Sequence, residues 1–258
     1  MPFLADQPGG VRSLALRFLP AAAEEWRTGM IDIPVFPFRS AQAFYDQLLA
    51  STPDSKTGKA DPKKMQMFMA AHPEILAAVG LIQKRPVSSG FAGDTFNGLN
   101  TFRFVNTEGV ATPVRWSVEP VQQPVPVGAA SPFDRKNAVF DALIAQVARR
   151  PVQWRLLVTV GQQGDPTRDP TLHWPANRQR IDAGTVTINR LWSVDGGPCV
   201  DVNFDPMVLP AGIEPSDDPI PSARSSAYSR SFTLREFERG VKPPSAVTPK
   251  EVQAGDQP

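Results

Sequence analysis

Apolar and polar residues alternate in several short segments of this chain, a pattern typical of β-strands. The alternation predicts strands over residues 11–19 and 29–38, joined by the link AAAEEWRT. Residues 101–106 and 113–119 alternate on either side of a Thr-Glu-Gly turn, which predicts a hairpin. Further strands are predicted over residues 154–160, 184–191 and 200–204.

Helical spacing and helix start signals occur between these strands. Ser40 is suited to cap a helix over residues 41–51, and Asp61 followed by proline is suited to begin one over residues 62–72. A His-Pro step interrupts the pattern, and another helix is expected over residues 73–85. Two more helices are predicted over residues 134–150 and 222–232. Strands early and late in the chain with helices inserted between them indicate an α+β fold.

Composition fits one folded domain, assigned to residues 1–240, followed by a polar, proline-rich tail over residues 241–258 that we expect to be disordered. The 28 prolines suit a β protein with long connections. A formal net charge of +1, with no basic block, argues against nucleic acid as a partner. No stretch approaches the roughly 20 apolar residues of a membrane span, so no membrane partner is expected.

Cys199 is the single cysteine, so neither a disulfide within the chain nor a cysteine-based metal site is expected. It lies in the segment GGPCVDVNF, which predicts a buried thiol on a strand. The two histidines are interpreted as structural: His72 at a helix end and His173 in a loop beside a tryptophan.

The segment with the clearest chemistry contains Tyr228, one of two tyrosines, four residues after Arg224. On a helix these side chains would lie one turn apart on the same face. A guanidinium held against a phenol favours the phenolate, a hard anionic oxygen suited to ferric iron. The alternative is a surface arginine beside a half-buried tyrosine. The other tyrosine, Tyr45, has alanine four residues before it and is not a candidate ligand.

Several longer segments carry a family resemblance. They read, in chain order, RSLALRF, EWRTGMIDIPVF, TFNGLNTFRFVNTEGVATPVRWSVEP, GDPTRDPTLHWP, IDAGTVTINR and NFDPMVLPAGIEPSDDP. In order and content they are similar to the catalase superfamily, most closely to the small catalase-related peroxidases of bacteria. The resemblance implies an antiparallel β-barrel with helical insertions, incomplete at its N-terminal end.

The same resemblance implies haem b as cofactor, with Tyr228 as the axial iron ligand and Arg224 as its activating partner, since tyrosinate is the haem ligand of catalases. Arg235 would reach a haem propionate, which needs a cationic partner in a partly apolar cavity. Arg12 opens a strand near the same site by this resemblance and would also contact the haem, or it is a solvated arginine at a strand end. Phe44 would lie over the haem plane, although helical spacing also suits it to a core.

The distal side departs from the family pattern. The family's distal histidine lies in an Arg-x-x-His-Ala-x-Gly segment, and neither histidine of this chain does. The family's distal asparagine, in an Asn-x-Pro context, corresponds to Asp32. This carboxyl group could move protons in place of the histidine, or the substitution could mark a lost site.

The expected function is therefore a haem-dependent peroxidase, an oxidoreductase that reduces hydrogen or organic peroxides with an organic electron donor. Because the distal histidine is missing, weak activity is expected. The alternatives are a non-catalytic haem-binding module or a truncated, inactive catalase-like fragment. The start MPFLADQPGG is unlike a signal peptide, so a cytoplasmic location is expected as written, or a periplasmic one if an upstream segment is missing. Homo-oligomerisation is left open.

Overall fold

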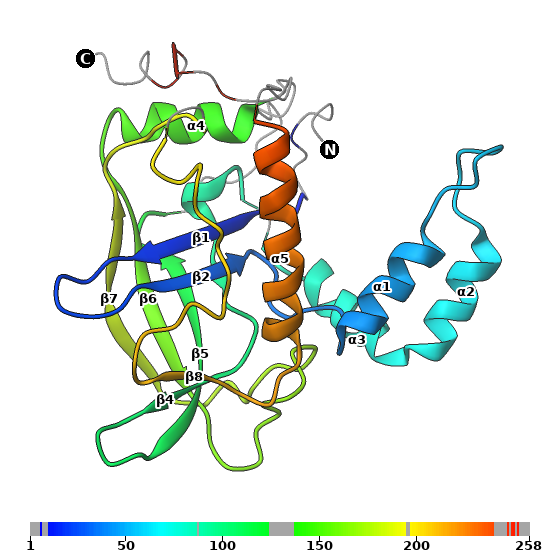
Figure 1. The fold of residues 1–258 in the computed structure, drawn as a ribbon, viewed down its shortest axis with the longest axis horizontal. Helices are drawn as coiled ribbons and strands as arrows, with labels where there is room; N and C mark the ends of the chain where they lie inside the picture. The colour runs from blue at the N-terminus through cyan, green and yellow to red at the C-terminus, as the bar shows by residue number, and fades with distance from the viewer. Residues whose placement is uncertain are drawn as a thin grey trace.

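The computed structural model describes residues 6, 10–86, 88–123, 137–194, 197–239, 247, 249–250 and 252. Strands and helices follow one another in these ranges as β1 (Ser13–Phe18), β2 (Trp26–Ile31), α1 (Ala41–Ala50), α2 (Pro62–Ala71), α3 (Pro73–Gln83), the 3-10 helix η1 (Phe91–Gly93), β3 (Phe96–Asn97), β4 (Phe102–Val105), β5 (Ala111–Pro120), α4 (Ala138–Val147), β6 (Val152–Val160), β7 (Arg180–Ile188), β8 (Ile213–Pro215) and α5 (Ile220–Phe237). The α+β class expected from the sequence is confirmed (Figure 1).

The strands form a single antiparallel sheet that curls around the core, with the ten-residue strand β5 at its centre. One edge of β5 pairs with β6, and β7 continues from β6. The other edge is shared, because β3 pairs with one end of β5 and β4 with the other. The β1–β2 hairpin joins β3 through a single residue pair, Ile31 with Asn97. That hairpin is thus held to the sheet by a narrow seam.

The concave side of the sheet holds the main core. Val114, Trp116 and Val118 occupy alternate positions of β5, so they share one face and are all buried. Two buried tryptophans keep their indole N–H groups bonded: Trp116 donates to Thr28 Oγ1 at 3.0 Å and Trp154 donates to the Asp94 carbonyl at 3.0 Å. Burial of these large rings therefore leaves neither donor unpaired.

The helices lie in three places around the sheet (Figure 1). Helix α5 crosses the open end of the β1–β2 hairpin, α4 contacts η1, and α1–α3 project to one side as an arm with a small apolar cluster of its own. Ser40 accepts from the Ala43 N–H and Asp61 from the Lys63 N–H, which confirms both predicted caps. Within the described ranges, no single helix is long and apolar enough to cross a bilayer; the bent pair α2 and α3, which turn by 99°, passes by length and composition only when taken together.

Three sequence predictions are wrong in detail. The strand expected over residues 29–38 ends at Ile31, because two prolines follow and cannot donate to a ladder. Residues 200–204 form no strand: the N–H groups of Val200 and Val202 donate to carbonyls three residues earlier, as in turns. Cys199 consequently lies exposed and not buried. The predicted tail, residues 241–258, falls almost wholly outside the described residues, so its disorder stays a prediction.

Candidate functional site

A cavity of about 210 Å³ lies between α5 and the β1–β2 hairpin. Ile220, Arg224 and Tyr228 line one side of it, spaced four residues apart along one stripe of α5. The opposite side is mostly apolar, and its side chains are Leu14, Ala15, Met30, Ile31, Phe36, Leu99 and Phe204. The predicted ligand helix therefore does present its arginine and tyrosine to an apolar space.

Arg224 and Tyr228 are bonded as the sequence predicted. Nη2 of Arg224 donates to the Tyr228 hydroxyl oxygen at 3.0 Å, with Nε at 3.3 Å, and the guanidinium lies 5.2 Å from the centre of the phenol ring. A guanidinium can only donate, so the tyrosine oxygen must accept. Any proton on that oxygen then points away from Arg224. The tyrosine oxygen thus has a cation fixed beside it by two hydrogen bonds.

On the side away from Tyr228, Arg224 is part of a chain of hydrogen bonds that extends through Asn100 to Asp218, called the donor chain below. Nη1 of Arg224 donates to Oδ1 of Asn100 at 2.9 Å, and Nδ2 of Asn100 donates to Oδ2 of Asp218 at 2.8 Å. Oδ1 of Asp218 in turn accepts from the Ile220 N–H at 2.9 Å, at the start of α5. Because arginine only donates, the amide of Asn100 can have only one orientation, which leaves its N–H₂ for Asp218.

Asp218 is the acidic end of this chain and is buried, with 4% of its surface exposed. Burial raises the pKa of Asp218, while the hydrogen bonds from Asn100 and the Ile220 N–H and the charge of Arg115 lower it. Asn100 is equally buried, at 3% exposure. The two side chains hold the guanidinium of Arg224 from behind, which fixes its position against Tyr228.

The backbone places Asn100 through an unusual turn between β3 and β4. Leu99 adopts a left-handed conformation with φ of 60°, which is uncommon for a residue with a side chain. The residue before Leu99 is Gly98. A Cβ at Gly98 would lie 2.9 Å from Nε1 of Trp116, so the backbone can pass the indole ring only because this residue is glycine. The turn directs Asn100 toward α5, and the strain at Leu99 is located at the cavity wall.

Gly29 on β2 has a similar role opposite Arg224. A Cβ at this position would lie 2.9 Å from Nη2 of Arg224. The glycine therefore allows the guanidinium to approach the strand closely. A glycine inside an alternating strand is a sequence signal of such an approach, and it could have identified this position.

The other sequence-predicted residues do not line this cavity. Arg12 is 7% exposed and its guanidinium donates to Asp94 at 2.7 Å and to Ser88 at 3.4 Å, in a buried polar cluster beside β1. Asp32 accepts the Arg12 N–H at 2.9 Å and lies 3.7 Å from Nε of Arg85. Burial raises the pKa of Asp32, while the Arg12 N–H and Arg85 lower it. The roles given to Arg12 and Asp32 stay predictions.

Phe44 and Arg235 also lie away from the cavity lining. Phe44 is 42% exposed on α1 and touches Phe36, which itself lines the cavity, at a ring separation of 6.1 Å. Arg235 is exposed near the end of α5 and donates to the Val202 carbonyl at 3.3 Å. Arg224 is thus the sole cation among the described residues that line the cavity.

The comparisons with known proteins agree with this geometry. A family profile for catalase matches residues 4–236, which is most of the chain. The chain belongs to the catalase family. It is 32% identical over 235 residues to a catalase-related peroxidase of Synechococcus elongatus, covering 91% of this chain and 69% of that protein. A catalase-related peroxidase of Mycolicibacterium paratuberculosis is 28% identical over 253 residues, covering 94% and 77%.

Solved catalases share the fold. A fungal catalase matches with a TM-score of 0.77 at 16% identity, over 96% of this chain and 52% of that one. A bacterial catalase matches with a TM-score of 0.76 at 19% identity, over 95% and 50%. This chain therefore spans about half the length of these catalases. The catalase-like architecture expected from the sequence is confirmed, with the described strands forming a curled sheet.

The residues at the cavity suit haem in chemistry. Tyr228 offers an oxygen ligand with a cation behind it, and apolar side chains face it across the cavity. The volume, about 210 Å³, is below the about 300–1,000 Å³ of sites that enclose an organic ligand, so the cavity does not enclose a whole macrocycle. Within the described ranges, no cluster of three His, Cys, Asp or Glu side chains offers an alternative metal site.

Proposed function

We propose that this chain binds haem b through Tyr228 and reduces hydrogen peroxide or organic peroxides at the expense of an organic electron donor. The observation that supports this is the oxygen of Tyr228, which accepts two hydrogen bonds from Arg224 and faces an apolar cavity. Membership of the catalase family and similarity to catalase-related peroxidases support the same activity.

Each residue of the donor chain has a defined task in this proposal. Arg224 stabilises negative charge on the Tyr228 oxygen, and Asn100 and Asp218 keep Arg224 in place. The apolar wall excludes water, which strengthens every electrostatic contact at the tyrosine oxygen. When bound, haem would supply the redox chemistry that no side chain here can provide.

One observation favours a second candidate function, a haem-binding module without peroxidase turnover. Neither His72 nor His173 lines the cavity, and the carboxylate of Asp32 is engaged by Arg12 and Arg85. General acid–base assistance is typically worth about a hundredfold to ten-thousandfold in rate. Asp32 stays the predicted distal acid, and Asp32→Asn should lower peroxide turnover by about a hundredfold if it has that role.

The deciding experiment is a haem titration of the purified chain, followed by peroxide and an organic donor. Tyr228→Phe should abolish the ferric tyrosinate band, and Tyr45→Phe, at the 55% exposed tyrosine of α1, is the matched control that should keep it. Equal spectra for the two variants would refute the ligand assignment. A band with donor turnover supports the peroxidase, whereas a band without turnover supports the binding module. Absence of any band in the unaltered chain would leave the third reading, an inactive fragment.

A further inference from the structure

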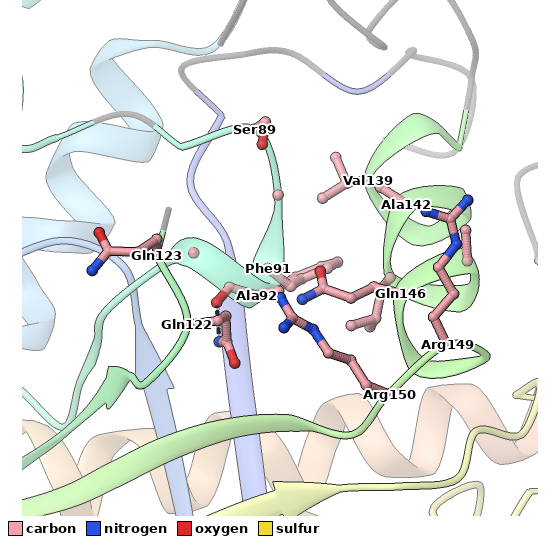
Figure 2. Close-up of a pocket in the computed structure, with 14 residues that line it drawn as sticks. Ser89, Phe91, Ala92, Gln122, Gln123, Val139, Ala142, Gln146, Arg149 and Arg150 are labelled. Carbon is pink, nitrogen blue, oxygen red and sulfur yellow. Dashed lines mark hydrogen bonds between the residues drawn. The ribbon is translucent and has the colours of Figure 1, made fainter. Parts of the chain in front are cut away.

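A second cavity, of about 520 Å³, lies between α4 and the segment 89–93 that contains η1 (Figure 2). None of the described residues lines both this cavity and the one at Tyr228. Its volume falls within the about 300–1,000 Å³ usual for sites that bind small organic molecules. Nothing in the proposed haem chemistry makes use of it.

The walls of this cavity are largely apolar. Phe91 from η1 and Val139 and Leu143 from α4 contribute side chains to it, with alanines beside them. The Phe91 ring is fixed by neighbouring rings, since its centre lies 5.1 Å from that of Phe140 and 6.5 Å from that of Phe96. A rigid aromatic wall of this kind suits a flat apolar ligand.

The polar groups at the cavity are uncharged or cationic. Gln146 and Arg150 project from the end of α4 toward Phe91 in Figure 2, whereas the guanidinium of the adjacent Arg149 points away from the space. The amide of Gln122 is already used, because it donates to the Ala92 carbonyl and accepts from the Gln153 N–H. Among the described residues that line the cavity, none has an acidic side chain.

Arg150 is the cation that this arrangement presents to a ligand. Among the described residues its guanidinium has neither an ion pair nor a side-chain hydrogen bond. An arginine just after a helix also favours the C-terminal end of the helix dipole. That effect accounts for stability at the end of α4, but it applies equally to Arg149 and does not explain why only Arg150 points into an apolar cavity.

We propose that this cavity binds a small organic anion with a flat apolar body and one carboxylate. The carboxylate pairs with the guanidinium of Arg150, whose planar fork matches it in two parallel hydrogen bonds, and receives an amide N–H from Gln146. The flat body lies against Phe91 and Leu143. The ligand class therefore follows from the guanidinium of Arg150, which faces the apolar wall and has no partner among the described residues.

The test is calorimetric titration of the full chain with 2-naphthoate, and with neutral 2-naphthamide, a ligand of the same shape, in parallel. Binding of the acid should be saturable and about five- to tenfold tighter than that of the amide, as one partly exposed charge-assisted contact provides. Arg150→Gln should remove this preference. Arg149→Gln is the matched control and should retain it, although it removes the same charge one residue away.

A third variant tests the location. Phe91→Leu removes the aromatic wall of the cavity and should weaken binding of both ligands, while circular dichroism checks that the variant remains folded. The proposal is overturned by unsaturable binding, by equal affinity for acid and amide, or by equal effects of the two arginine variants. It is likewise overturned if the folded Phe91→Leu protein binds the acid unchanged.

Discussion

Asn100→Leu is the substitution that probes the donor chain behind Tyr228 most directly. Leucine has nearly the same volume but can neither accept from Arg224 nor donate to Asp218. Asn100 is 3% exposed, so water cannot readily take over either contact. An unpaired buried polar group costs about 1–3 kcal/mol, and Arg224 is only half-buried, so we expect a loss of about 2–4 kcal/mol in the free energy of unfolding.

The loss should also depend on pH, and its sign follows from Asp218. Burial raises the pKa of Asp218 in the folded state above its unfolded value of about 4. Below the unfolded pKa the carboxyl group is protonated in both states, and its burial does not oppose folding. As pH rises through the folded pKa, the buried group ionises and the free energy of unfolding falls. The Asn100 hydrogen bond lowers that folded pKa. Removing it raises the pKa further, so the loss in Asn100→Leu should be larger at pH 8 than at pH 4.

Urea unfolding at several pH values between 4 and 8 measures both effects. The control is Asn97→Leu, which removes the hydrogen bond from Asn97 to the Ile33 carbonyl at 3.0 Å without touching Asp218. It should cost about 0.5–1.5 kcal/mol at every pH. The difference in free energy of unfolding between Asn100→Leu and Asn97→Leu should grow from pH 4 to pH 8. If it does not, the Asn100 amide does not set the pKa of Asp218, and the reasoning is refuted.

Two further predictions concern close contacts elsewhere. Gly29→Ala should weaken the ferric tyrosinate band in a haem titration, because the new Cβ would lie 2.9 Å from Nη2 of Arg224 and would displace the guanidinium from Tyr228. The melting temperature should change less than in Asn100→Leu, because the clash is with the end of a side chain and not with backbone; an unchanged band would show that this approach is unimportant. Asp94→Leu should lower the free energy of unfolding by about 3–5 kcal/mol, because it leaves the guanidinium of Arg12 buried without its carboxylate. In the same denaturation assay Glu119→Gln, at the exposed pair with Arg180, should cost about 0–1 kcal/mol, and a similar loss in both variants would contradict the argument.

The sequence predicted the parts of this protein that depend on local pattern. Alternation identified the β4–β5 hairpin, start signals identified α1 and α2, and a four-residue spacing identified the Arg224–Tyr228 pair. These features follow from periodicity along one element.

The remaining parts of the site depend on distant contacts. Asn100 and Asp218 are separated by 118 residues and meet only because β3, β4 and the start of α5 converge. No spacing along the chain indicates that meeting. Arg12 likewise reads as an exposed strand-end residue, and its burial depends on Asp94, 82 residues later. The strand predicted over residues 200–204 failed because apolar residues in a turn can alternate just as they do in a strand.

The narrow seam between β2 and β3 has a consequence for how a large group could enter the site. The β1–β2 hairpin forms one wall of the Tyr228 cavity, yet in the sheet it is joined to β3 through one residue pair. Beyond that pair the hairpin is held by the core, because Met30 is buried there, Thr28 accepts from the Trp116 indole N–H, and Trp26 packs edge-on against the same ring. Movement of this wall would therefore break core contacts around Trp116 as well as the single β2–β3 pair, so the width of the Tyr228 cavity is tied to the packing of the core.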